Sequence, residues 1–260
     1  MTTTIIRFEM INTVTNNFEI KLPPTGLTYE HYPPMKEQYQ DYFSFGIFGR
    51  GEIDGLIYNY ESYTPGNEMK PESTQNVKGT FTYQAANKMM QTYADRNPDL
   101  KFYGHTLTWH SQSPTWMWDA PPGDYDQPGE YDREIALENM ETHIENVFSY
   151  YGADLVATDV VNEAIGVVIL NDWKGSLAKG EGWYNALGWE WVELAFLKAA
   201  EVVDENGWDV KLIYNDFGLD WTSKARVVYD MVKDINERYA DVRPNGVVEN
   251  LRCLRKCLYD

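Results

Sequence analysis

An asparagine and a glutamate follow each other at the end of an apolar segment. The segment reads Asp159-Val-Val-Asn162-Glu163-Ala164, and the apolar residues leading into it predict a β-strand. A carboxyl group at the mouth of such a strand, partly shielded from water, can give a proton to a departing group and later take one back. Glu163 is therefore a candidate general acid/base. A carboxylate that caps the next helix would give the same pattern, so position alone leaves both interpretations open.

A second polar group combines hydrogen-bonding side chains with an indole ring. His105, Trp109 and Gln112 lie in one short segment, again after a predicted strand, and sugar recognition requires this combination. Metal ligation by His105 and His110 is an alternative, and either histidine could instead be a hydrogen-bonded core residue. Their spacing does not match a helical H-E-x-x-H site, and no nearby carboxylate or cysteine completes a ligand set. We therefore predict no metal site.

Two further polar groups follow predicted strands. In the segment 63–72, Asn67 and Lys70 could bind hydroxyl groups, whereas the two glutamates of the segment could be structural. Asn215 and Asp216 bring another amide and another carboxylate to the end of a later apolar run. Taken alone, each of these groups is an ordinary polar loop.

The elements that must position these groups alternate between short apolar runs and amphipathic helices. We expect strands at 43–48, 60–64, 101–107, 155–161 and 210–214. Four apolar stripes predict helices between and after them, and these are Ala86, Met89, Met90 and Tyr93; Leu137, Met140, Ile144, Val147, Phe148 and Tyr151; Val192, Ala195, Phe196, Ala199, Val202 and Val203; and Val228, Met231, Ile235 and Tyr239.

The ends of three helices carry local signals. The second stripe should close at Gly152 and the third at Gly207, while Thr222 and Ser223 are candidate caps for the fourth helix. Repeated βα units of this kind build either an open doubly wound sheet or a (β/α)8 barrel, and periodicity does not choose between them. The Pro/Gly-rich stretch 121–129 predicts a long loop, and in a barrel such loops build the active face.

Composition bounds the class of protein. The 260 residues suffice for one barrel-sized domain, and 43% hydrophobic with 24% charged residues predicts a globular core. The net charge of -18 argues against a nucleic-acid partner, whereas a neutral polysaccharide meets no repulsion. Part of the 19 Tyr, 10 Phe and 9 Trp could offer flat faces to sugar rings.

The termini and cysteines add little structure of their own. Residues 1–40 predict an extended N-terminal arm, because two Pro-Pro pairs block regular structure there. The first ten residues lack the pattern of a secretory signal, and no run reaches membrane-spanning length, so we expect a soluble chain without a membrane partner. Cys253 and Cys257 give neither a disulfide framework nor a metal quartet.

The four polar groups, in this order and spacing, resemble glycoside hydrolase family 10, whose members are mainly endo-1,4-β-xylanases and are often secreted. The similarity runs from about residue 42 to about residue 246. It implies an α/β fold of the (β/α)8 TIM-barrel lineage over 41–260, with about five to six of the eight βα units present. It also implies retaining cleavage of xylan or xylo-oligosaccharides without a cofactor.

The resemblance assigns roles to individual side chains. Glu163 would be the general acid/base, and Asn162 would bind the sugar 2-hydroxyl beside the cleaved bond. His105 and Trp109 match residues that line the same subsite. The remaining matches are Asn67, Lys70 and Gln112, which would bind the glycone side of the chain, and Asn215 with Asp216, which would support the catalytic centre.

Two departures from the family pattern change the expectations. Gly66 stands where the family usually has a glutamate, which removes a hydroxyl-binding carboxylate from the glycone site. A retaining glycosidase also needs a second carboxylate about 5 to 5.5 Å from the first, and the family takes it from a Thr-Glu-Leu-Asp-like segment that this sequence does not contain. Glu249 would lie within a strand rather than beyond its mouth. We therefore expect a barrel altered or truncated after about residue 246 that lacks its nucleophile, with a non-catalytic xylan-binding or vestigial barrel fragment as the alternative.

Overall fold

The computed structural model describes residues 7–8, 20–21, 33–42, 44–48, 57–118, 132–180, 182–243 and 246–248. Within them, five parallel strands form one sheet in the order β3-β4-β5-β6-β7, so each strand pairs with its neighbours in the sequence. A doubly wound sheet would instead reverse its strand order at a switch point. The described strands therefore follow barrel order, and the doubly wound alternative is wrong.

The five strands lie where the sequence predicts them. They are β3 (Gly46–Phe48), β4 (Ser62–Thr64), β5 (Lys101–Thr108), β6 (Leu155–Asn162) and β7 (Lys211–Asn215). Phe43, the first residue of the first predicted strand, lies outside the described residues, as does the predicted loop at 121–129. The longest strands, β5 and β6, pair in the middle of the sheet with His105 opposite Asp159.

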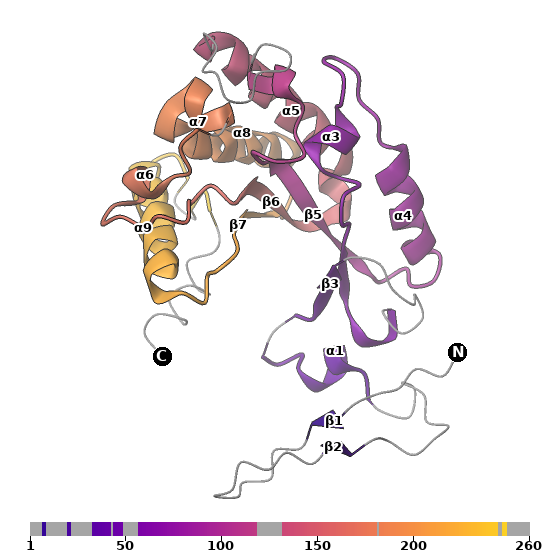
Figure 1. Ribbon diagram of the computed structural model, residues 1–260. Helices are drawn as coiled ribbons and strands as arrows, with labels where there is room; N and C mark the ends of the chain where they lie inside the picture. Colours follow the sequence, from indigo (N-terminus) through magenta and orange to yellow (C-terminus); the bar gives the residue numbers. More distant parts are fainter. Residues whose placement is uncertain are drawn as a thin grey trace, which may run out of the picture.

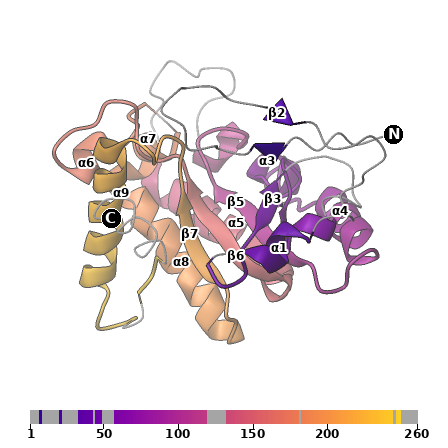
Figure 2. The ribbon, with the colours of Figure 1, turned by 90° about the horizontal axis from the view of Figure 1, so that it is seen from below.

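Four long helices match the four apolar stripes. They are α4 (Gln84–Ala94), α5 (Arg133–Tyr151), α8 (Trp191–Asn206) and α9 (Thr222–Arg238). These helices lie around the outside of the curved sheet, and a view from below shows α4, α8 and α9 on successive sides of it (Figures 1 and 2). The sheet thus has one face covered by helices, as a barrel requires.

Shorter elements connect this framework. They are α1 (Met35–Gln38), α3 (Pro71–Thr74), α6 (Trp173–Ser176) and α7 (Gly182–Leu187), with the 3-10 turns η2 (Thr115–Trp118), η3 (Gly152–Asp154) and η4 (Gly188–Glu190). In the predicted N-terminal arm, β1 (Arg7–Phe8) pairs antiparallel with β2 (Ile20–Lys21). Most of residues 1–40 lie outside the described residues, so the boundary at residue 40 stays a prediction.

The core lies between the sheet and the helices. Ile144 and Phe148 of α5, Phe196 of α8 and Val160 of β6 are fully buried in one hydrophobic cluster. Burial of each such side chain contributes about 1.5 to 3 kcal/mol, so this layer holds the helices against the sheet. No helix of the described residues is long and apolar enough to cross a membrane.

The predicted helix ends have mixed outcomes. Gly207 ends α8 with a left-handed φ of 65°, as predicted. Gly152 follows α5 but keeps right-handed helical angles and leads into η3, so it is not a left-handed cap. A Cβ built on Gly152 would lie 2.0 Å from the ring of Trp208, so glycine is needed there for close packing.

The predicted caps Thr222 and Ser223 are wrong. Trp221 is the N-cap of α9, and no side chain accepts a hydrogen bond in that position. The helix begins at Thr222, so both hydroxyl-bearing residues lie inside its first turn rather than before it.

Candidate active site

Glu163 lies directly after the last residue of β6 with a strained backbone. Its φ is 55°, a left-handed value that costs a non-glycine residue of order 1 kcal/mol. The Glu163 N–H donates to the Asn215 carbonyl oxygen at 2.8 Å, which holds the turn in place. The next helix, α6, begins only at Trp173 and is capped by Asp172. The interpretation of Glu163 as a helix cap is therefore wrong.

Trp109 connects this carboxylate to a polar cluster. The indole Nε1–H of Trp109 donates to Glu163 Oε2 at 3.0 Å, and the Lys70 ammonium lies 4.8 Å from the centroid of the Trp109 ring. Lys70 Nζ also donates to Asn67 Oδ1 at 3.0 Å and to Gln112 Oε1 at 2.5 Å. Of the residues predicted to bind sugar, Trp109 thus contacts Glu163 directly, and Lys70, Asn67 and Gln112 are linked to it through Trp109.

Burial and charge act in opposite directions on Lys70. The side chain is buried, which lowers the pKa of its ammonium from the ordinary value, while the carboxylates of Glu163 and Glu68 oppose that change. Glu68 also accepts a hydrogen bond from the Asn67 N–H at 2.9 Å, which is the structural role expected of it. The ammonium is thus desolvated and pre-oriented, the condition in which a charged donor interacts most strongly with a ligand.

His105 is oriented by a buried carboxylate. Its Nδ1 lies 2.7 Å from Asp159 Oδ2, and the Tyr103 hydroxyl donates to Asp159 Oδ1 at 2.6 Å. Burial raises the pKa of Tyr103, with a further contribution from the charge of Asp159. The contact between Nδ1 and Asp159 fixes the orientation of the imidazole ring.

The ends of β6 and β7 are linked by a pair of amides. Asn215 Nδ2 donates to Asn162 Oδ1 at 2.8 Å, and Asn162 is buried. The amide of Asn215 therefore orients that of Asn162. Whether either touches sugar stays a prediction.

Asp216 belongs to a buried ion pair. It accepts from Lys224 Nζ at 2.7 Å and from the Tyr214 hydroxyl at 2.5 Å, and the Tyr214 oxygen accepts the N–H of Ile165 at 2.9 Å. Burial raises the pKa of Asp216, against the opposing effects of Lys224 and Tyr214. Through Tyr214, this pair holds the chain immediately after Glu163.

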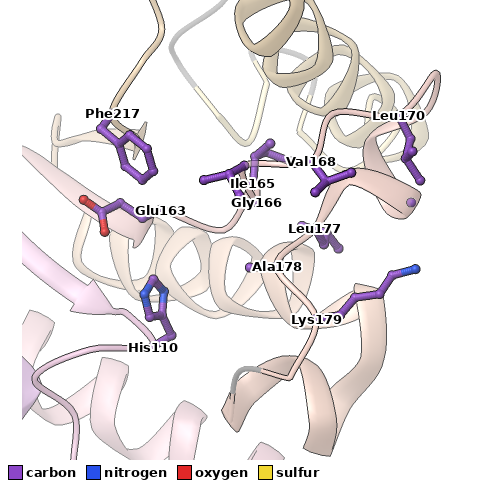
Figure 3. Close-up of a pocket in the computed structure, with 12 residues that line it drawn as sticks. His110, Glu163, Ile165, Gly166, Val168, Leu170, Leu177, Ala178, Lys179 and Phe217 are labelled. Atoms are coloured by element: carbon purple, nitrogen blue, oxygen red, sulfur yellow. The ribbon is translucent and has the colours of Figure 1, made fainter.

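A cavity of about 560 Å³ opens beside Glu163. Glu163, His110 and Phe217 lie at one end of it, and Leu170 and Lys179 lie at the other (Figure 3). Nδ1 of His110 is buried without a hydrogen-bond partner among the described residues. The rest of the lining comes from the loop between β6 and α6 and from the residues after it, namely Ile165, Gly166, Val167, Val168, Gly175, Leu177 and Ala178.

These strand-end residues coincide with a family match. Residues 51–248 match glycosyl hydrolase family 10. The chain belongs to glycosyl hydrolase family 10. This family and its solved members are (β/α)8 barrels, so the predicted fold class is confirmed.

Individual relatives of the family 10 chain carry xylanase names. Endo-1,4-beta-xylanase A of Caldicellulosiruptor sp. (strain Rt8B.4) is 32% identical over 223 residues, which cover 83% of this chain and 31% of the relative. Endo-1,4-beta-xylanase A of Halalkalibacterium halodurans is 34% identical over 217 residues, covering 78% of this chain and 52% of the relative. The chain thus spans about half or less of the length of these two relatives.

A solved structure shows the same fold. The crystal structure of xylanase B from Clostridium stercorarium F9 superposes with a TM-score of 0.65 at 28% identity, over 80% of this chain and 62% of that chain. The polar clusters of this family 10 chain therefore lie on a barrel scaffold.

Sequence reasoning missed part of the site. The sequence patterns give Asp159 no role, although a carboxylate inside an apolar strand must be paired when buried, and that signal could have identified it. The lining of the cavity after Glu163 had no polar signal at all. For the metal alternative, the described residues hold no group of three or more His, Cys, Asp or Glu side chains that could bind a metal ion.

Proposed function

We propose that this family 10 chain carries the acid/base half of an endo-1,4-β-xylanase site acting on xylan or xylo-oligosaccharides. The observation that supports it most directly is the contact from Glu163 through Trp109 to Lys70. This arrangement joins a proton-transfer group to an aromatic face and a charged hydrogen-bond donor. These parts could transfer a proton and bind a sugar ring and its hydroxyls.

Glu163 would act on the oxygen that leaves. Its Oε2 is held by Trp109, so Oε1 would carry the proton to the glycosidic oxygen as the bond breaks. The resulting carboxylate would then take a proton from the water that completes hydrolysis. Lys70, Asn67 and Gln112 would bind hydroxyls on the glycone side.

The residues nearest the cleaved bond would have fixed orientations. His105 is hydrogen-bonded to Asp159, and Asn162 is hydrogen-bonded to Asn215. Each side chain is therefore restricted to one rotamer before the substrate binds. Such preorganisation is what makes hydrogen bonds effective in a transition state.

The carboxylate at the neighbouring strand end does not fit the role of the nucleophile. Asp216 stands at the neighbouring strand end, but it is buried and both of its carboxylate oxygens are hydrogen-bonded. Glu249 lies outside the described residues. Because the printed sequence has no Thr-Glu-Leu-Asp-like segment, we propose that these 260 residues bind xylan without rapid turnover.

The test measures binding and turnover together. The purified chain is first shown to be folded by circular dichroism and size; xylotriose binding is then measured by calorimetry and reducing-end release from xylan is followed, with Glu163→Ala as the control. We expect binding with little turnover. A folded chain that releases ends at about 1 s⁻¹ or faster, when Glu163→Ala does not, contradicts the missing nucleophile, and a folded chain that does not bind xylotriose contradicts the sugar site.

A further inference from the structure

Four apolar side chains open to water surround the cavity beside Glu163. The exposed fractions are 72% for Val167, 70% for Val168, 46% for Leu170 and 48% for Phe217. Single exposed apolar residues are ordinary, but a cluster of them that rims a cavity marks a binding surface.

The loop that carries three of these residues is closed on itself. The Gly166 N–H donates to the Ser176 carbonyl at 2.8 Å, and the Ala178 N–H donates to the Ala164 carbonyl at 2.9 Å. The Leu170 N–H donates to the Ser176 hydroxyl at 2.8 Å. These bonds tie both ends of the loop to the segment that follows it, and Val167 and Val168 lie between them with exposed side chains.

The cavity and the polar cluster around Lys70 both adjoin the Glu163 carboxylate. Contacts from this carboxylate lead through Trp109 to Lys70 on one side, whereas the cavity extends from the same carboxylate along the loop after β6. A general acid stands between the two sugars that part. If the Lys70 side holds the glycone, as in the proposed function on which this step rests, the cavity holds the leaving group.

The lining selects the chemistry of that leaving group. Glu163 and His110 lie together at the catalytic end and Lys179 lies at the far end, with apolar side chains between them (Figure 3). Between the two polar ends, the hydroxyls of a bare sugar would meet apolar side chains that cannot hydrogen-bond, which is unfavourable. An aromatic ring would instead cover the valines, and the volume of about 560 Å³ is that of a small-molecule site.

We propose that this cavity binds an aromatic group on the leaving-group side of the substrate, such as an aryl aglycone or an aromatic acyl substituent on the departing sugar. Val167 and Val168 are then specificity-determining residues. The polar cluster around Lys70 then determines which sugar binds, and Val167 and Val168 determine which group attached to that sugar is accepted.

Binding of two non-hydrolysable probes tests this inference. Phenyl 1-thio-β-xylobioside and methyl 1-thio-β-xylobioside share the sugar and differ only in the group that would enter the cavity. Calorimetry with the 260-residue chain should show the phenyl probe binding at least about tenfold more tightly. The double variant Val167→Asn/Val168→Asn should bring the ratio close to one while leaving the methyl probe unchanged.

Controls separate the two proposals. Val242 is 79% exposed and lies after α9, so Val242→Asn should leave both affinities unchanged. Lys70→Met should weaken both probes and preserve their ratio. Equal affinities in the unaltered chain, or a phenyl preference that survives the double variant, would overturn the aromatic cavity alone. No binding of either probe to the folded chain would overturn the sugar site and with it this inference.

Discussion

The two sides of Glu163 differ in polarity. On one side, Lys70 is buried and bonded to Asn67 and Gln112, so its polar groups are desolvated and pre-oriented. On the other, Val167 and Val168 stand in water around a cavity. A site built on hydrogen bonds rejects a wrong ligand by factors of about 10⁴ to 10⁵, whereas an apolar pocket discriminates by about 10 to 200. The polar side should therefore be strict and the apolar side permissive.

The largest expected effect is that of Glu163→Ala on the rate of cleavage, because Glu163 lies between the two sides. Azide can act as an external nucleophile in place of the missing carboxylate. It attacks the anomeric carbon as the bond from that carbon to the phenolic oxygen breaks, and the product is an α-xylobiosyl azide. With phenyl β-xylobioside, Glu163 must supply the proton that makes phenol, so Glu163→Ala should slow azide-dependent cleavage by about 10²- to 10⁴-fold. With 2,4-dinitrophenyl β-xylobioside, the loss should be small. Release of the two phenols measures both rates.

Two outcomes of this experiment would count against the account. Equal losses for the two leaving groups would mean that Glu163 is not the proton donor. Cleavage that never responds to azide in a folded chain would mean that Glu163 does not face a bound sugar.

The polar side should depend strongly on its one buried ammonium. Lys70→Met removes two hydrogen bonds from a charged donor, to Asn67 Oδ1 and Gln112 Oε1, and leaves Asn67 Oδ1 only its weaker bond from Gln112 Nε2. We expect xylotriose to bind about 10- to 100-fold more weakly, because a hydrogen bond from a charged donor to a sugar hydroxyl contributes about 1.5 to 3 kcal/mol. Lys78 is exposed, so Lys78→Met is the matched control. A loss of threefold or less in calorimetry would show that Lys70 is structural.

Low pH should lower the free energy of unfolding through His143, which contacts the short helix next to Lys70. His143 of α5 is fully buried, and its Nδ1 lies 2.7 Å from Oε1 of Gln75, the C-cap of α3, whose N-cap is Lys70. Burial lowers the pKa of His143 to about 4. The unfolded chain, with an ordinary histidine pKa of about 6.5, binds the proton first, so this contribution to stability is present above pH 6.5 and is lost as the pH falls towards 4. The loss attributable to His143 should reach about 3 kcal/mol.

Denaturant unfolding at pH 7 and pH 4 measures this loss. Many carboxylates titrate over the same range, so the comparison is between the unaltered chain and His143→Gln. The free energy of unfolding should fall more in the unaltered chain. Equal falls in the two proteins would remove His143 as the cause.

The smallest effect is a gain at the glycone edge. Gly66 lacks the carboxylate that family 10 usually has there, and a hydrogen bond to a charged acceptor contributes about 1.5 to 3 kcal/mol. Gly66→Glu should therefore tighten xylotriose binding by roughly tenfold or more. Unchanged or weaker affinity with the fold intact would show that a missing acceptor does not limit the polar side.

Sequence patterns predicted the polar side far better than the apolar side. The strand-end clusters were recognisable because Asn67, Lys70, Trp109 and Glu163 are chemically unusual after apolar runs. The run Ile165-Gly-Val-Val-Ile-Leu170 gives no such signal, since hydropathy assigns an apolar run to a core. In the structure, Ile165 is buried and pairs with Leu177, whereas Val167, Val168 and Leu170 of the same run are exposed.

Long-range packing explains the other differences. The strands were predicted within a few residues because their apolar runs are bounded by polar groups. The role of Gly152 could not be predicted, because it depends on Trp208, which lies on a different element. The partners of Asp159 likewise come from β5, and no local pattern shows that register.

A crystal structure with phenyl 1-thio-β-xylobioside tests the central claim most directly, because it shows both sides of Glu163 at once. The account predicts the two sugar rings against Trp109 and the Lys70 cluster, the sulfur within hydrogen-bond reach of the Glu163 carboxyl group, and the phenyl ring over Val167 and Val168. A ligand whose sugars lie in the valine-lined cavity, or whose sulfur lies away from Glu163, would contradict it.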